Sequence, residues 1–155
     1  MPMKNISYGE VQNMESVRLL NEYRAILQNN DHMISGLEVM QKIPEPTISQ
    51  RTRIKELEDH LIPDGIRKEK DLGARIRPLV EQLQGEGSLA EIRRRTVIEL
   101  RYLSLLEWQQ IAEALYPDEG EEANTKRRRY LIRQAFRYHA AAVEQLDELL
   151  RSADR

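Results

Sequence analysis

Six cations lie close together in one stretch of the chain, residues 124–139. This stretch contains Lys126, Arg127, Arg128, Arg129, Arg133 and Arg137, and it contains no acid. Four of the six, Lys126, Arg129, Arg133 and Arg137, are spaced by three and four residues, which brings them to one face of a helix. A guanidinium group binds phosphate oxygens or pairs with guanine O6 and N7. The spacing therefore predicts a basic helix face suited to duplex DNA; the alternative is a solvated face with incidental arginines.

Acids flank this cationic stretch on both sides. Asp118–Glu122 carries four acids, Asp118, Glu119, Glu121 and Glu122, and Glu144–Asp154 carries four more, while the net charge of the whole chain is -2. The basic surface is therefore a local feature of a mildly acidic protein. The first acidic group either stabilises the N-terminus of the helix that follows or contacts a protein partner. The second group offers Glu144 and Asp147 as alternative ion-pair partners for Arg133 and Arg137.

Three predicted helices position the cations, at residues 89–103, 107–115 and 125–150. The first follows the capping box of Ser88 and Glu91, and the third follows the capping pair Asn124-Thr125. In the second, Trp108, Ile111, Ala112 and Leu115 recur at i, i+3, i+4 and i+7, so they share one apolar face. Trp108 is accordingly expected in the core rather than as a stacking residue.

The rest of the chain also favours helix, so the predicted fold class is all-α. Helices are expected at residues 8–41 (as one helix or two), 49–62 and 66–83. Pro63-Asp64-Gly65 is expected as a turn, and Pro78 as a kink or a helix boundary. Gly85-Glu86-Gly87 predicts a linker between two domains, residues 1–84 and 88–150. The first domain is expected to be a coiled segment for dimerisation or partner binding, or else a monomeric helical hairpin lying on the second.

Several classes of function are disfavoured by composition. The chain has no cysteine, which removes disulfides, thiolate zinc sites and cysteine nucleophiles. Its three histidines are scattered, and His139 is expected to be partly exposed near the phosphates. No glycine-rich phosphate loop or nucleophile motif occurs. We therefore expect no enzyme activity, no metal and no cofactor. An apolar signal core and a membrane-length apolar run are also lacking, which favours a cytoplasmic protein that does not contact membranes.

An ordered set of short motifs in the C-terminal half resembles a known family. These motifs are Val97–Tyr102 (VIELRY), Trp108–Leu115 (WQQIAEAL) and the run Arg137, His139, Ala142 and Val143. Together they resemble region four of bacterial sigma factors and, more closely, the small sigma-like late-gene regulators of phages and prophages (ArpU/RinA type). The resemblance covers residues 72–146. It implies a trihelical helix-turn-helix domain preceded by a coiled N-terminal half.

The resemblance also assigns roles to individual residues. The residues expected to read bases are Arg133, Gln134 and Arg137. Those expected to contact phosphates are Lys126, Arg127, Arg128, Arg129, Arg94 and Arg101. The core of the helix-turn-helix is expected to contain Leu100, Trp108, Ile111, Ala112, Leu115, Ala135 and Tyr138. The sequence departs from the family pattern in two places: Glu107 replaces the usual Ser or Thr cap, and residues 116–125 lengthen the turn before the third helix.

The function implied by the resemblance is sequence-specific binding of double-stranded DNA by a transcriptional regulator in the cytoplasm of a bacterial host. A dimer would bind two half-sites about 10 base pairs apart or a multiple of that. Contact with RNA polymerase is implied by the resemblance alone. Two alternatives remain open. One is a small terminase-like DNA-packaging protein, and the other is a polymerase-binding module that does not bind DNA.

Overall fold

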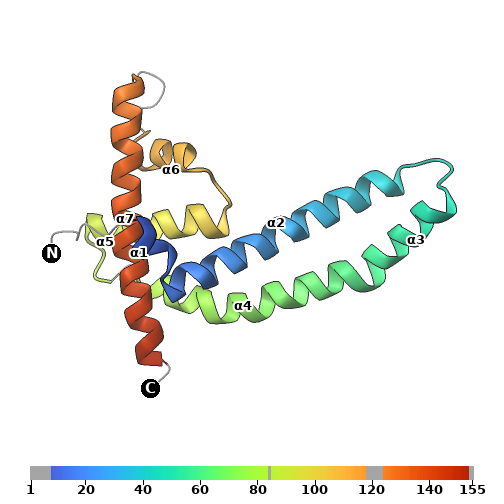
Figure 1. Cartoon of the computed structure of the whole chain (residues 1–155), viewed down its shortest axis with the longest axis horizontal. Coiled ribbons are helices and arrows are strands. Elements are labelled where there is room, and N and C mark those ends of the chain that lie inside the picture. The colour runs from blue at the N-terminus through green and yellow to red at the C-terminus, as the bar shows by residue number, and fades with distance from the viewer. Residues whose placement is uncertain (1–7, 84, 118–123, 154–155) are drawn as a thin grey trace. The chain divides into compact units, whose positions relative to one another are not determined.

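The computed structural model describes residues 8–83, 85–117 and 124–153, and these are helical almost throughout, with no strand among them. In chain order the elements are α1 (Tyr8–Gln12), α2 (Glu15–Gln41), α3 (Ile48–Glu56), the π-helical segment η1 (Leu57–Leu61), α4 (Ile62–Gln82), α5 (Leu89–Ile98), the π-helical segment η2 (Glu99–Leu103), α6 (Trp108–Leu115) and α7 (Thr125–Ala153) (Figure 1). The all-α prediction is confirmed.

The three C-terminal helices begin where their capping residues predict. The Ser88 hydroxyl accepts from the Glu91 amide at 3.2 Å, and the Glu91 carboxylate accepts from the Ser88 amide at 3.3 Å, so the capping box that starts α5 is complete. At the start of α7, the Asn124 side chain accepts from the Arg127 amide at 2.8 Å. Glu107 precedes α6, where the Gln110 side chain accepts from the Glu107 amide at 2.9 Å.

The turn expected at Pro63-Asp64-Gly65 is wrong, because the chain stays helical from Ile48 to Gln82. The π-helical segment η1 explains how proline fits. The Ile62 amide donates to the Leu57 carbonyl five residues back, so this turn is wider than an α-turn. A wider turn directly before Pro63 reduces the conflict between the proline ring and the carbonyl of the preceding turn. Pro78 does not end α4 either.

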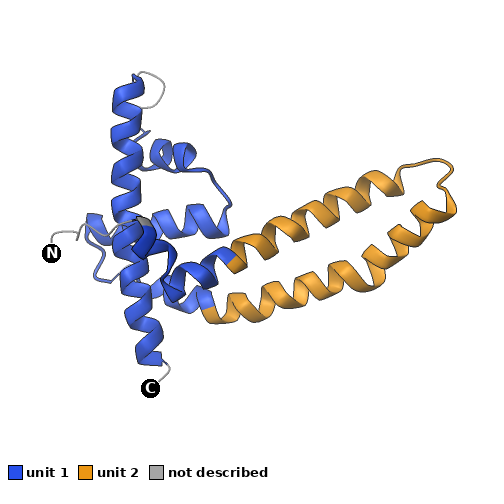
Figure 2. Cartoon of the chain, in the orientation of Figure 1, with its two compact units in different colours: residues 1–21, 76–155 blue, residues 22–75 orange. Residues whose placement is uncertain are grey.

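The chain divides into two compact units, residues 1–21 with 76–155 (unit 1) and residues 22–75 (unit 2) (Figure 2). This division differs from the predicted one at Gly85–Gly87, since α2 and α4 each pass from one unit into the other. Ser16, in the first turn of α2, accounts for part of the difference. Its amide donates to the Asp147 carboxylate of α7 at 2.8 Å, and its hydroxyl donates to the Val143 carbonyl at 2.9 Å.

Apolar residues of the N-terminal helices complete the interior of unit 1. Leu20 of α2 and Val80 of α4 are buried, and they line one small depression together with Leu146 and Leu150 of α7. The C-terminal half of α7 therefore packs against helix ends that lie more than sixty residues earlier in the chain. Such contacts cannot be seen in a local sequence pattern, and they explain why residues 8–21 belong with α7.

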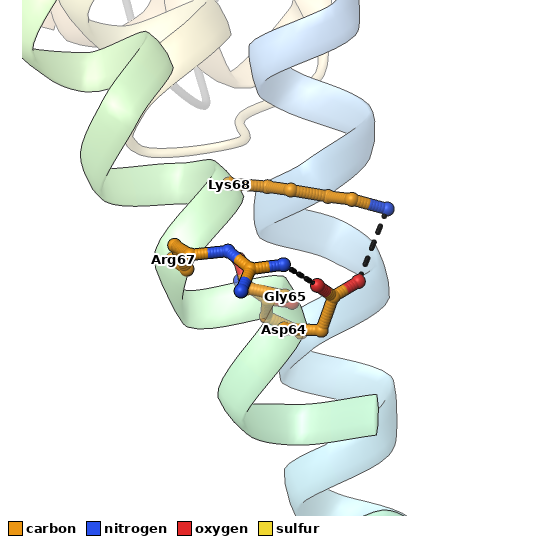
Figure 3. Close-up of polar contacts among 5 residues, drawn as sticks. Asp64, Gly65, Arg67 and Lys68 are labelled. Atoms are coloured by element: carbon orange, nitrogen blue, oxygen red, sulfur yellow. Dashed lines mark hydrogen bonds and ion pairs between the residues drawn. The ribbon is translucent and has the colours of Figure 1, made fainter. Parts of the chain in front are cut away.

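Unit 2 is a helical hairpin in which large side chains of α2 meet glycines of α4. Tyr23 is buried, and its hydroxyl lies 3.0 Å from the position that a Cβ at Gly73 would take. Asn30 is also buried and donates through its side-chain nitrogen to the Gly65 carbonyl at 3.0 Å. Next to Gly65, on the surface of α4, Asp64 pairs with Arg67 and with Lys68 (Figure 3).

Replacing Gly65 with alanine is expected to destabilise the chain by about 1–2 kcal/mol. A Cβ at this position would overlap the Asn30 side-chain oxygen, so the hydrogen bond from Asn30 to the Gly65 carbonyl would break. The cost of losing a buried hydrogen bond exceeds the gain in helix propensity from glycine to alanine. Gly36→Ala in α2 is the matched control, since nothing lies within 4 Å of its Cβ position, and it should stabilise by up to about 1 kcal/mol. Urea unfolding measures both, and equal stabilisation by the two variants would contradict this account.

Candidate nucleic-acid interface

Helix α7 is held in unit 1 by a core that it shares with α5 and α6. Val97, Ile111 and Ala135 are completely buried at its centre. Leu100, Leu106, Trp108, Leu115 and Tyr138 pack against these three side chains. The structure thus brings together six of the seven residues assigned to the core, and it buries the seventh, Ala112, on the same helix as Ile111. One face of α7 is thereby fixed toward α5 and α6.

The four cations at helical spacing lie on α7 away from this core. Lys126, Arg129, Arg133 and Arg137 are all exposed, whereas Leu131 and Ala135, which fall between them in sequence, are buried. We call these four residues the basic stripe. From Lys126 to Arg137 it extends roughly 16 Å, at about 1.5 Å of helix rise per residue. The helix that carries it is about 10–12 Å in diameter with its side chains, which fits the major groove, about 12 Å wide.

Glu144 and Asp147, which the sequence suggested as ion-pair partners, do not neutralise Arg133 and Arg137. Within the described ranges, neither Arg133 nor Arg137 forms an ion pair. Asp147 instead accepts the Ser16 amide hydrogen bond, which ties it to α2. The positive charge of the stripe therefore faces solvent, where it is available to an anionic partner.

Two partly exposed aromatic residues of α7 were missed in the sequence. Tyr130 is 41% exposed and Phe136 is 39% exposed. Tyr130 lies four residues after Lys126 and three before Arg133, so it belongs to the same face as the stripe. The Arg127 guanidinium lies 4.8 Å from the centre of the Tyr130 ring, close enough for a cation–π contact. The same spacing rule that found the cations could have found Tyr130.

Three other residues assigned to DNA lie beside the stripe rather than on it. Arg127 contacts Tyr130, as described, and Gln134 is half-buried. Arg128 is exposed but lines a shallow depression with Gln109 and Tyr116. It therefore lies on the side of α7 that faces α6. A helix turns about 100° per residue, so consecutive cations in the run 126–129 necessarily face different directions.

Arg101 has a structural role in the connection between η2 and α6. Leu105 in this connection adopts a left-handed conformation, with φ of 62°. The Leu106 amide donates to the Leu100 carbonyl at 2.9 Å, and Arg101 donates to the Leu106 carbonyl at 3.3 Å. The Arg101 guanidinium also lies 5.2 Å from the centre of the Trp108 ring. These contacts orient the start of α6, and they set Arg101 apart from the exposed cations.

Arg94 on α5 is half-buried, and its Nε finds no acceptor among the described residues. The neighbouring Arg93 is the residue of α5 that connects to the other helices. Its guanidinium lies 5.0 Å from the Tyr116 ring centre and donates to the Tyr138 hydroxyl at 3.2 Å. Neither Arg93 nor Arg94 belongs to the basic stripe, which lies on α7.

The expectation that His139 is partly exposed is wrong, because only 4% of it is accessible. Its Nε2 lies 2.6 Å from the Tyr102 hydroxyl of η2, and the Trp108 ring approaches it edge-on at 5.1 Å between ring centres. Burial, and to a lesser degree the nearby charge of Arg101, lowers the pKa of His139 to about 4. His139 is therefore neutral near pH 7 and contributes no charge to DNA binding.

The acidic group at Asp118–Glu122 lies outside the described residues. In the part of the chain that the structure describes, no group of three or more His, Cys, Asp or Glu side chains could hold a metal ion. No helix in that part is long and apolar enough to cross a membrane. Comparisons with protein-family models, with curated proteins and with solved structures found no match.

Proposed function

We propose that the chain is a sequence-specific regulator of transcription that binds double-stranded DNA with the first half of α7. The observation that carries this proposal is the basic stripe, four exposed cations in a row on a helix whose opposite face is fixed by α5 and α6. The stripe gives the charge that phosphates attract and the guanidinium groups that recognise guanine. The resemblance to phage and prophage sigma-like regulators supports the same function.

Within this interface, residues take two kinds of role. Arg133 and Arg137 point away from the core on the central part of the exposed face, and they are proposed to contact base edges. Arg129 and Lys126, about one and two turns before Arg133, are proposed to contact phosphates, with Arg127 and Arg128 at the sides of the helix. Tyr130 lies between the two groups and offers an aromatic ring to a thymine methyl or a sugar. Gln134 lies beside the stripe, and Arg94 and Arg101 lie on α5 and η2, so these three residues are not placed in this interface.

The affinity of the intact chain for duplex DNA is expected to fall steeply with salt. Each phosphate contact releases counterions and contributes about −0.9 to the slope of log affinity against log salt. The four cations proposed to contact phosphates, Lys126, Arg127, Arg128 and Arg129, therefore predict a slope of roughly −3 to −4. Fluorescence anisotropy of a labelled random-sequence duplex at several salt concentrations measures it. The breakpoint of a titration at a duplex concentration well above the Kd gives the number of chains per duplex, two for a dimer. Absence of binding at low salt would contradict DNA binding and favour a protein partner such as polymerase.

A further inference from the structure

Unit 1 contains a cavity of about 250 Å³ that the proposed DNA interface does not use. Four rings contribute to its wall, those of Tyr102 from η2, Trp108 from α6, and Phe136 and His139 from α7. The Trp108 and Phe136 ring centres are 4.5 Å apart, and the Tyr102 and His139 ring centres are 5.6 Å apart. The hydrogen bond between Tyr102 and His139 holds the second pair in place. The Trp108 and His139 rings also contact each other, so the four rings form one continuous aromatic wall.

Polar groups complete the lining of this cavity. Gln12 of α1 and Asn21 of α2 contribute amides, and both residues are exposed, so they mark the side open to solvent. Among the described lining residues, Arg101 contributes the one full charge, since His139 is neutral near pH 7. No carboxylate is among the described residues of the lining. A wall of rings with one cation and no acid disfavours a cationic ligand and favours a ring that carries a negative group.

We propose that this cavity binds a small aromatic acid, with the ring against the aromatic wall and the carboxylate on the Arg101 side. The volume is below the roughly 300–1,000 Å³ of drug-sized ligand sites, which limits the ligand to one or two rings. Guanidinium–carboxylate pairing is strong and directional, so it discriminates an acid from its neutral amide. Ligand binding here does not depend on DNA binding, and either can fail without the other.

Arg101 already has a carboxylate neighbour, which supplies a matched test. Its Nη1 lies 3.4 Å from Glu107 Oε2, and the Glu107 side chain is 71% exposed and does not line the cavity. A ligand carboxylate would share the guanidinium with Glu107 and would be repelled by it. Glu107→Gln should therefore strengthen the binding of an acid while leaving the binding of a neutral analogue unchanged. Glu113→Gln, on an exposed residue of α6 outside the cavity, changes the net charge equally and is the control.

The test is calorimetric titration of the intact chain with phenylacetate and with its neutral isostere 2-phenylacetamide. Trp108 is the single tryptophan of the chain, so its emission provides a second readout from the cavity wall. We expect saturable binding of phenylacetate with a Kd on the order of 1 mM or tighter, about 10-fold tighter than the amide, which is within the range for a ligand of this size. Glu107→Gln should tighten phenylacetate severalfold, and Glu113→Gln should not.

A variant that fills the cavity provides a second, independent test of the proposal. Ala140 lines the cavity and is 7% exposed, so Ala140→Phe should remove phenylacetate binding if the variant folds. Glu107→Gln alters an exposed side chain, so the test does not depend on Ala140→Phe. The proposal is overturned if phenylacetate shows no saturable binding, if the amide binds as tightly as the acid, or if Glu107→Gln and Glu113→Gln have the same effect.

Discussion

Replacing Arg133 and Arg137 together with alanine is expected to weaken binding to duplex DNA about 100-fold or more. Each arginine that contacts a base edge is worth roughly 1–3 kcal/mol, and both lie exposed on the basic stripe without an ion pair in the described residues. Alanine is the best helix former, so α7 itself should remain folded. Anisotropy titrations of wild type and variant at one salt concentration measure the loss.

The matched control removes two exposed cations from unit 2. Arg51→Ala/Lys55→Ala on α3 lowers the net charge equally but leaves the stripe intact, so its affinity for DNA should change little. Equal losses for the two double variants would indicate a general charge effect and contradict a specific interface. The salt slope separates the two roles of the arginines. A slope that is flatter by about 0.9 per residue indicates lost phosphate contacts, and an unchanged slope indicates lost base contacts.

Lowering the pH from 7 to 4 is expected to cost the folded chain about 3 kcal/mol through His139 alone. Burial lowers the pKa of this histidine to about 4, against about 6.5 in the unfolded chain, and each pKa unit corresponds to about 1.4 kcal/mol. The unfolded chain takes up a proton as the pH falls below 6.5, whereas the folded chain does not. Stability is therefore unaffected by His139 above pH 6.5, declines below it, and has lost the full amount near pH 4.

Urea unfolding of wild type and His139→Gln at several pH values isolates this contribution. Carboxylates affect both proteins equally, so the difference between the two curves reports His139. The variant should lose less stability than wild type between pH 7 and pH 4. His60→Gln is the control, because His60 lies exposed on η1. Parallel curves for wild type and His139→Gln would show that His139 is not held neutral by the fold.

Local signals in the sequence were sufficient for the helices of the C-terminal half and for their core. Capping residues and apolar spacing act within one or two turns, so Ser88, Asn124 and the Trp108–Leu115 pattern predicted α5, α6 and α7 within a few residues. The basic stripe followed from the same spacing. The all-α class followed from composition, because few residues in the chain favour strands.

Contacts between distant residues, together with two unusual backbone conformations, account for the features that could not be predicted. Pro63 and Gly65 form a turn in most local contexts, but η1 makes room for the proline and Asn30 binds at the glycine. His139 was misplaced because its partner Tyr102 lies 37 residues away. The structural contact of Arg101 was not foreseen, because it depends on the left-handed Leu105, which brings the Leu106 carbonyl within reach of its guanidinium. The Asn30–Gly65 and Tyr102–His139 pairs are separated by 35 and 37 residues, so no local pattern predicts them. The η1 and Arg101 contacts are local, but they depend on a π-helical turn and a left-handed leucine, which residue spacing does not predict.

The hydrogen bonds from Ser16 to α7 limit which fragments of the chain can keep unit 1 intact. A fragment cut at the glycines, residues 88–150, would expose Val143, Leu146 and Leu150, which the N-terminal helix ends help to cover. Unit 2 is an insertion within unit 1, and Leu20 and Ile76, at its two ends, line the same depression. The fragment that preserves unit 1 is therefore one in which a short connection replaces residues 22–75, as when an inserted domain is removed from its host.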